Sequence, residues 1–360
     1  RDLHLSLRRQ RQMCIRDRWD VQGHISGNAQ VQWNEDLVQL TASKLELESV
    51  VATNDRWNID ESKVILEVDG RVDSEARILT EASAIFRCTS VSMKVDDLHV
   101  DFPEDGAPAA QGNIKYRGDL SRISRWFTPR GKRPTQRLTG QLNGNVQLAH
   151  QGDATVARWN AVIGDLTIER NPDILGVSGM QPVSHNNAWE TVWSEKELRM
   201  TGQGTLDQES ESFQLEDLQV QSQLVAMTAT GQIQDVMEQR EADISGSVHY
   251  DMHHIVQSLR GYLGPGVEIL GQKQSPFNLR GSLKTSDSRR TTSAIPHTVV
   301  VDATFSWDAG SAYGLTLGGA EMHAQLAKQI VSFTPIKLSL IHISEPTRRT
   351  PISYAVFCLK

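Results

Sequence analysis

Hydrophobic and polar residues alternate along much of this chain with a period of two. In the clearest stretch, residues 299–307, Val299, Val301, Phe305 and Trp307 share one parity with Ala303, and mostly polar residues hold the other. Because successive strand side chains point to opposite faces, this pattern predicts a strand with one apolar face. The same alternation predicts strands over residues 64–72, 91–95, 138–148, 200–206, 225–233 and 244–250.

The predicted strands carry features of a curved sheet. Glycine inside a strand is costly unless it marks a bulge, a bend or a close approach. The hydrophobic parity also shifts between Val95 and Leu98, as at a β-bulge. We therefore expect a long, curved antiparallel sheet, open as a half-pipe or β-groove. The strand glycines are Gly140, Gly144, Gly202, Gly204, Gly231, Gly246 and Gly281.

Helical spacing interrupts the strands twice. Hydrophobic residues three and four apart predict short amphipathic helices near residues 117–128 and 252–263. Each follows a tyrosine, Tyr116 or Tyr250, and each ends in a Gly- and Pro-containing segment.

These features recur at a fixed distance, which predicts a tandem repeat of about 134 residues. Val91 and Met93 match Val225 and Met227, for example. We expect a first β segment over residues 19–142, a second over 143–283 and the start of a third over 284–337. The other matched pairs are Gly70 with Gly204, Asp73 with Asp207, Gly112 with Gly246 and Tyr116 with Tyr250.

The two ends do not fit this pattern. Residues 1–18 and 338–360 resemble translated sequencing-adapter read-through and are expected to be artefactual or disordered. The whole chain has a net charge of −7, and residues 19–337, with 28 basic and 41 acidic side chains, have −13. Such a surface disfavours general nucleic-acid binding. Cys88 is the only cysteine between the ends, so the redox compartment is undetermined.

No motif predicts an enzyme. The chain has no Gly-rich phosphate loop, no H-E-x-x-H motif and no nucleophile elbow, so no catalytic residue and no cofactor is assigned. The best metal candidate is the group His249, His253 and His254. Ordinary surface histidines are the simpler interpretation, and no metal site is predicted.

Residues 117–137 form a basic segment, with seven Lys or Arg against one acid. Together with the apolar face of the first predicted helix, this suggests an interfacial helix on anionic head groups. The alternative is a solvated helix docked on the sheet rim. The second predicted helix keeps the apolar face but little of the charge, which favours an architectural role for the helix and leaves the basic cluster unexplained. The membrane-contact candidates are Arg122, Arg125, Trp126, Phe127, Arg130, Lys132 and Arg133.

The apolar face of the sheet is the second candidate surface. If a second sheet covers it, its side chains are core. If it stays open, it exposes more apolar area than a soluble protein normally leaves bare, and acyl chains are the natural ligand. The lipid-groove candidates are Val64, Leu66, Val68, Val91, Met93, Val225, Met227, Val299, Val301, Phe305 and Trp307.

Long alternating strands, glycine-containing strand ends such as residues 140–144 and 246–250, and a Trp-started block at 193–198 resemble the AsmA-like proteins of bacterial envelopes, chiefly the large planctomycete-type members. The resemblance implies a membrane-tethered half-pipe that carries phospholipid or another acyl lipid between membranes. It implies a periplasmic place with an inner-membrane anchor absent from this sequence, a membrane surface as partner, and no catalysis. The alternative is a structural or adhesive β-repeat protein with a packed interior and recognition on its loops.

Overall fold

A computed structural model of the chain describes residues 19–54, 57–104, 108–128, 131, 134, 136–171, 189–258, 260, 264, 266–284, 296–328 and 330–334. The protein is mainly β, and its hydrogen bonding assigns 17 strands to one antiparallel sheet. The chain divides into two compact units, with unit 1 ending near Thr201 and unit 2 starting near Ser210. The predictions for residues 1–18 and 338–360 fall outside the described residues.

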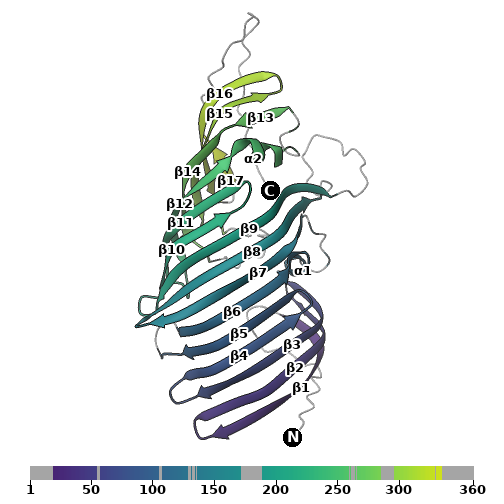
Figure 1. The fold of residues 1–360 in the computed structure, drawn as a ribbon, viewed down its shortest axis with the longest axis vertical. Coiled ribbons are helices and arrows are strands. Elements are labelled where there is room, and N and C mark those ends of the chain that lie inside the picture. Colours follow the sequence, from purple (N-terminus) through teal and green to yellow (C-terminus); the bar gives the residue numbers. More distant parts are fainter. Residues whose placement is uncertain are drawn as a thin grey trace, which may run out of the picture. The chain divides into compact units, whose positions relative to one another are not determined.

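Unit 1 is an up-and-down meander in which each strand from the first to the eighth pairs antiparallel with the next (Figure 1). Its elements are β1 (Asp20–Asn34), β2 (Leu37–Thr53), β3 (Asn58–Asp73), β4 (Ile78–Cys88), β5 (Val91–Asp101), β6 (Ala109–Asp119), α1 (Leu120–Trp126), β7 (Gln136–Gln151), β8 (Ala154–Arg170) and most of β9 (Glu190–Asp207).

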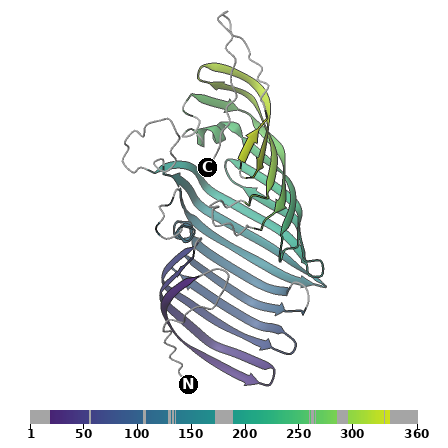
Figure 2. The same ribbon diagram turned by 180° about the vertical axis from the view of Figure 1, so that it is seen from behind.

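Unit 2 repeats the meander with one irregularity. β13 and β14 both pair with β15, because Gly271, at φ +142°, interrupts what would otherwise be one strand. Figure 2 shows the strands of each unit from behind. The elements of unit 2 are β10 (Ser212–Gln221), β11 (Val225–Gln234), β12 (Glu241–Asp251), α2 (Met252–Ser258), β13 (Val267–Leu270), β14 (Gln272–Ser282), β15 (Val300–Ala312), β16 (Leu315–Ala327) and β17 (Ile330–Phe333).

The predicted strands lie within observed strands, apart from Val299, which immediately precedes β15. The observed strands are longer than predicted, up to 18 residues in β9. The predicted bulge after Val95 is confirmed, because the register between β5 and β6 shifts between Asp96 and His99. Asp97 there adopts φ +53°. The bulge lets the apolar face continue although the parity of the sequence changes.

Both helices begin where a strand ends in aspartate. Asp119 caps α1 by accepting a hydrogen bond from Ser121 N at 2.9 Å, and Asp251 Oδ1 accepts from His253 N at 2.9 Å at the start of α2. These side chains satisfy amide groups that lack a partner in the first helical turn. The hydrogen bond from the Ser121 hydroxyl is the largest of the causes that lower the Asp119 pKa.

Strand pairing relates the two strand–strand–helix stretches without a constant spacing. Val91 pairs with Gly118 and Val225 with Tyr250, so β6 matches β12 at a separation of 132 residues, while β5 matches β11 at 134. The helices also start 132 residues apart, at Leu120 and Met252. Tyr116 and Tyr250 therefore occupy different places along their strands. A tandem repeat stays a prediction.

Two of the strand glycines make room for aromatic rings. Gly144 pairs with Tyr116, and a Cβ built on Gly144 would lie 2.5 Å from Tyr116 Cζ. Gly246 pairs with Phe277, whose ring would lie 2.8 Å from such a Cβ. At both positions any larger residue would displace the ring that crosses the neighbouring strand.

Candidate functional site

The strand register of unit 1 gathers the hydrophobic residues on one face. Directly paired residues of neighbouring antiparallel strands point to the same face, so the register identifies rows that run across the sheet. One row crosses all eight strands from β1 to β8. It consists of Gly27, Leu45, Leu66, Phe86, Met93, Tyr116, Gly144 and Ala161.

Two further rows lie on the same face of unit 1, both on the same side of this one. The first row brings together the lipid-groove candidates Leu66 of β3 and Met93 of β5, which are 27 residues apart in sequence, and the candidate Val68 belongs to the second row. One row is Val68, Ala84, Val95, Ile114, Val146 and Trp159, and the other is Trp33, Val38, Val72, Leu79, Val100 and Ala110. We call these three rows the apolar face of unit 1.

The opposite face of unit 1 carries charge. One row of paired positions there consists of Lys44, Glu67, Ile85, Lys94 and Lys115, four of which are charged. Glu46 on this face contacts both Lys44 and Lys63, each at 2.8 Å. The sheet is therefore amphipathic, with a charged face that favours water.

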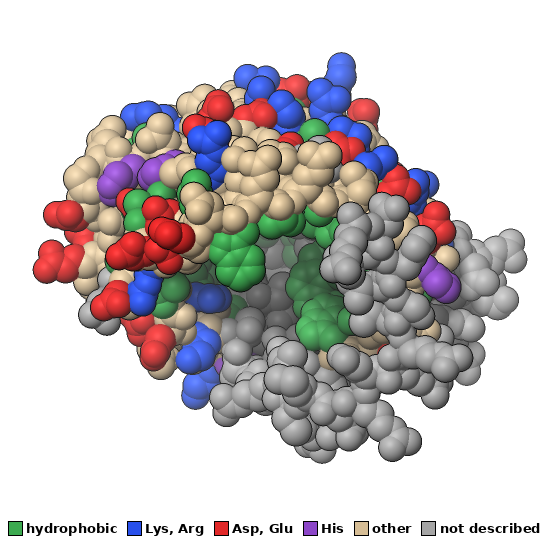
Figure 3. All heavy atoms as spheres, turned by 90° about the horizontal axis from the view of Figure 1, so that it is seen from below, with side chains coloured by type: hydrophobic (Ala, Val, Ile, Leu, Met, Phe, Trp, Pro, Cys, Tyr) green, Lys and Arg blue, Asp and Glu red, His purple; other side chains and the backbone are tan. Residues whose placement is uncertain are grey.

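Several residues of the apolar face remain exposed. Trp33 is 78% exposed, Val72 43% and Met93 36%, whereas Val64 and Val95 are buried. The view from below shows hydrophobic side chains gathered in one area, with many charged side chains around it (Figure 3). The lipid-groove candidates of unit 1 thus lie on a face that is partly open to solvent.

Unit 2 has corresponding rows of paired residues. Met227 pairs with Val248, and Val301 pairs with both Leu279 and Leu326. One complete row runs from β10 to β17. It consists of Leu215, Gly231, Ile244, Leu279, Val301, Leu326 and Val331.

Part of unit 2 is nevertheless a closed core. Tyr250 is 1% exposed and its ring lies 5.7 Å from that of Phe305. Its hydroxyl accepts a hydrogen bond from Ser306 N at 2.8 Å and lies 3.1 Å from Ser275 Oγ. Tyr250 thus links β12, β14 and β15 beyond the paired residues 277–280 of β14 and 300–303 of β15. Of the candidates, Val299 and Trp307 are 2% and 6% exposed, so they are core residues of this unit.

Helix α1 is docked on unit 1 through its apolar side. Leu120 is buried, and Ile123 lies against Gly118. Trp126 donates its indole N–H to Glu61 Oε1 at 3.1 Å. Glu61 is 2% exposed and also accepts from Thr89 N at 3.0 Å and from the Ser90 hydroxyl.

The described membrane-contact candidates differ in exposure, and their contact with a membrane stays a prediction. Trp126 is half-buried, while Phe127 is 56% exposed and its ring contacts that of Trp57, with centroids 4.5 Å apart and planes tilted by 44°. Arg122 lies 3.6 Å from Asp119, and Arg125 is exposed. The remaining membrane-contact candidates, Arg130, Lys132 and Arg133, are outside the described residues.

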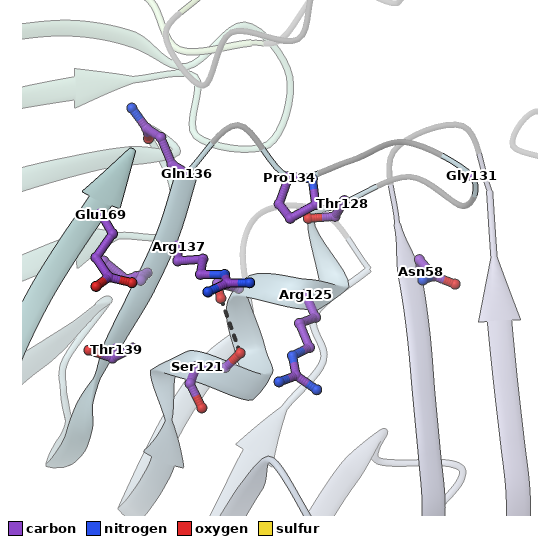
Figure 4. A pocket seen from close by; sticks show the side chains of 12 residues that line it. Asn58, Ser121, Arg125, Thr128, Gly131, Pro134, Gln136, Arg137, Thr139 and Glu169 are labelled. Carbon is purple, nitrogen blue, oxygen red and sulfur yellow. Dashed lines mark hydrogen bonds between the residues drawn. The ribbon is translucent and has the colours of Figure 1, made fainter. Parts of the chain in front are cut away.

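A cavity of about 710 Å³ lies between α1 and the start of β7. Arg125 of α1 and Arg137 of β7 line it, together with Thr139 and Glu169 (Figure 4). The alternating pattern gave no signal for this site, because its residues come from a helix, a strand end and a strand of opposite direction. The basic composition of residues 117–137 was the only sequence indication.

The other chemical candidates are not brought together. His253 Nε2 contacts Gln257 at 2.6 Å and His254 Nδ1 contacts Asp251 at 3.2 Å, so each is engaged by a residue three or four positions away in sequence. Among the described residues, no group of three or more His, Cys, Asp or Glu is placed to hold a metal ion. Burial raises the pKa of Cys88, which makes its thiol a weak nucleophile. No helix in the described part of the chain is both long and apolar enough to span a bilayer.

No protein-family model matches this chain, and neither a curated protein nor a solved structure was found to be similar to it.

Proposed function

We propose that the protein holds acyl chains of phospholipid, or of another acyl lipid, along the apolar face of unit 1 and so acts without catalysis. The observation that carries the proposal is the row of paired apolar residues and glycines that crosses eight strands, opposite a charged face. Each CH₂ group removed from water on such a face contributes about 0.8 kcal/mol. The exposure of Trp33, Val72 and Met93 on the apolar face supports the open surface that this function needs.

The resemblance to AsmA-like envelope proteins gives this proposal a setting. In that setting the chain is one segment of a longer, tandem-repeated conduit that passes lipid between the membranes of a bacterial envelope. The head groups stay in water while the acyl chains follow the sheet.

A photo-crosslinking experiment tests the occupancy of the apolar face. p-Benzoylphenylalanine is placed at Met93, which is 36% exposed on this face, or at Ser92, the next residue along β5 on the charged face. Both proteins are purified from a membrane-containing host, irradiated and examined by intact-mass spectrometry. We expect a phospholipid adduct at Met93 and none at Ser92.

The matched positions make the outcome decisive. The two residues are adjacent in one strand, so expression, purification and local stability are closely matched. A lipid-free protein at both positions, or equal adducts at both, would overturn the proposal. Circular dichroism checks that each variant keeps the strand content of the unmodified chain.

A second candidate function is a structural or adhesive β-repeat protein with a packed interior. The buried Tyr250, Val299 and Trp307 of unit 2 favour it, because they form an ordinary core rather than a lipid surface. A protein of this class gives no lipid adduct at Met93 and binds its partner through loops.

A further inference from the structure

We propose that the cavity between α1 and β7 binds a phosphate group. The site lies wholly within unit 1 and is separate from the acyl-chain surface proposed above, although it deepens that function if the phosphate belongs to a lipid. Its wall combines two guanidinium groups with hydroxyl and amide groups. The lining residues used in this argument are Ser121, Arg125, Thr128, Arg137, Thr139 and Glu169.

The two arginines provide the positive charge. Arg125 projects from the last turn of α1, and its guanidinium pairs with no carboxylate among the described residues. Arg137 lies near the start of β7 with its guanidinium carbon 4.0 Å from the centre of the Trp189 ring, which fixes the orientation of the group. Figure 4 shows Arg137 reaching from β7 toward α1. Guanidinium groups match phosphate oxygens in a bidentate geometry, so two of them favour a phosphate over a single carboxylate.

The hydroxyl groups add neutral donors. The Ser121 hydroxyl is already committed to Asp119 at 2.6 Å, so it can only accept. Thr128 and Thr139 line the same cavity from the end of α1 and from β7, and their hydroxyl groups have no partner among the described residues. They can donate to phosphate oxygens that the arginines leave unbonded.

The Glu169 carboxylate would repel a bound anion, so a variant without this charge tests whether the cavity binds an anion. It is the direct cross-strand partner of Arg137 and the single acid among the described lining residues. Removing its charge should strengthen phosphate binding. If the cavity bound a cation instead, removal of this charge would weaken binding of that cation.

The test is a calorimetric titration of the full chain with inorganic phosphate at low salt. We expect Arg125→Gln and Arg137→Gln each to weaken binding about tenfold, because each removes a charge-assisted hydrogen-bonding group. Glu169→Gln should strengthen it. Arg122→Gln is the matched control, since Arg122 belongs to the same helix but pairs with Asp119 and does not line the cavity. Thermal melts check that each variant is folded.

Three outcomes overturn the site. Absence of phosphate binding at millimolar concentration is one, and equal weakening by Arg122→Gln and Arg125→Gln is another, because it would show general attraction to the basic segment. Weaker binding by Glu169→Gln is the third. Dihexanoyl phosphatidic acid is titrated in parallel. Tighter binding of this soluble lipid than of inorganic phosphate identifies a head group as the source, and equal binding identifies free phosphate.

The result is separable from the acyl-chain proposal. Met93→Asp changes the apolar face and should leave inorganic phosphate binding unchanged, because Met93 does not line the cavity. Lipid adducts at Met93 without phosphate binding would overturn only the phosphate site. Phosphate binding without lipid adducts would overturn only the acyl-chain function.

Discussion

The same alternating pattern produces a partly exposed apolar face in unit 1 and a partly buried core in unit 2. In unit 1 one of the apolar rows crosses eight strands, and residues such as Trp33 and Met93 stay exposed. Unit 2 has comparable rows, but part of its apolar surface is a closed core in which Tyr250 is 1% and Trp307 6% exposed. The difference shows that alternation specifies an apolar face without specifying whether that face is covered.

The placement of one tyrosine accounts for much of this difference. Tyr116 pairs with Met93 and Gly144, and its ring lies over the glycine on the sheet surface. Tyr250 lies one residue from the end of β12, where its hydroxyl reaches the backbone of Ser306 on β15. A shift of two residues along equivalent strands thus turns a surface ring into a bridge between strands.

The largest expected effect is the loss of the unit 2 core. Trp307→Ala removes a buried ring whose indole N–H donates to Gly318 O at 3.2 Å, and we expect a loss of about 3–5 kcal/mol in the free energy of unfolding. Met93→Ala in unit 1 should cost under about 1 kcal/mol, because that side chain already meets water. Hydrogen–deuterium exchange on peptides of each unit measures both. Equal losses of protection would show that the units do not differ as described.

The next effect concerns the buried carboxylate of unit 1. Glu61→Ala leaves Thr89 N, the Ser90 hydroxyl and the Trp126 indole without their acceptor, and we expect a loss of about 3 kcal/mol, since each unsatisfied buried donor costs roughly 1–3 kcal/mol. Glu61→Gln retains the volume and one acceptor oxygen, so its loss should be smaller. Exchange at α1 amides reports the undocking. Unchanged α1 protection in Glu61→Ala would show that Trp126 does not anchor this helix.

The predicted strands, both helices and the bulge follow from short-range pattern, and the structure contains them. The row that contains Leu66 and Met93 could also be predicted from the sequence, because period-two alternation shows which side of each strand is apolar. The burial of Trp307 could not be predicted in this way. Trp307 and Met93 both lie in alternating stretches, yet Trp307 is buried and Met93 is exposed in the folded protein. The cavity at Arg137 depends on the packing of α1, which is a tertiary contact that spacing does not encode.

A smaller effect tests the bridging hydroxyl itself. Tyr250→Phe keeps the ring contact with Phe305 and removes only the hydroxyl, leaving Ser306 N without its acceptor. We expect a loss of about 1–2 kcal/mol, the usual range for one buried hydrogen bond and its unsatisfied partner. Tyr116→Phe is the matched control and should change little, because the Tyr116 hydroxyl makes no hydrogen bond within the described residues. Equal losses of stability in the two variants would show that the hydrogen bond between Tyr250 and Ser306 does not cause the difference between the units.

The smallest effect belongs to the charged face of unit 1 and depends on pH. Hydrogen bonds from Lys44 and Lys63 lower the pKa of Glu46 from 4.5 to about 2. A carboxyl group whose pKa is lower in the folded protein stabilises that state above its unfolded pKa, and this contribution is lost as the pH falls from about 4.5 toward 2. Glu46→Gln should therefore lower stability slightly at pH 6 and have little effect near pH 2. The difference should shrink in high salt, because both lysines are exposed. Urea titrations of both proteins from pH 2 to 6 measure it, and a Glu46→Gln effect that grows as the pH falls would contradict the assigned ion pairs.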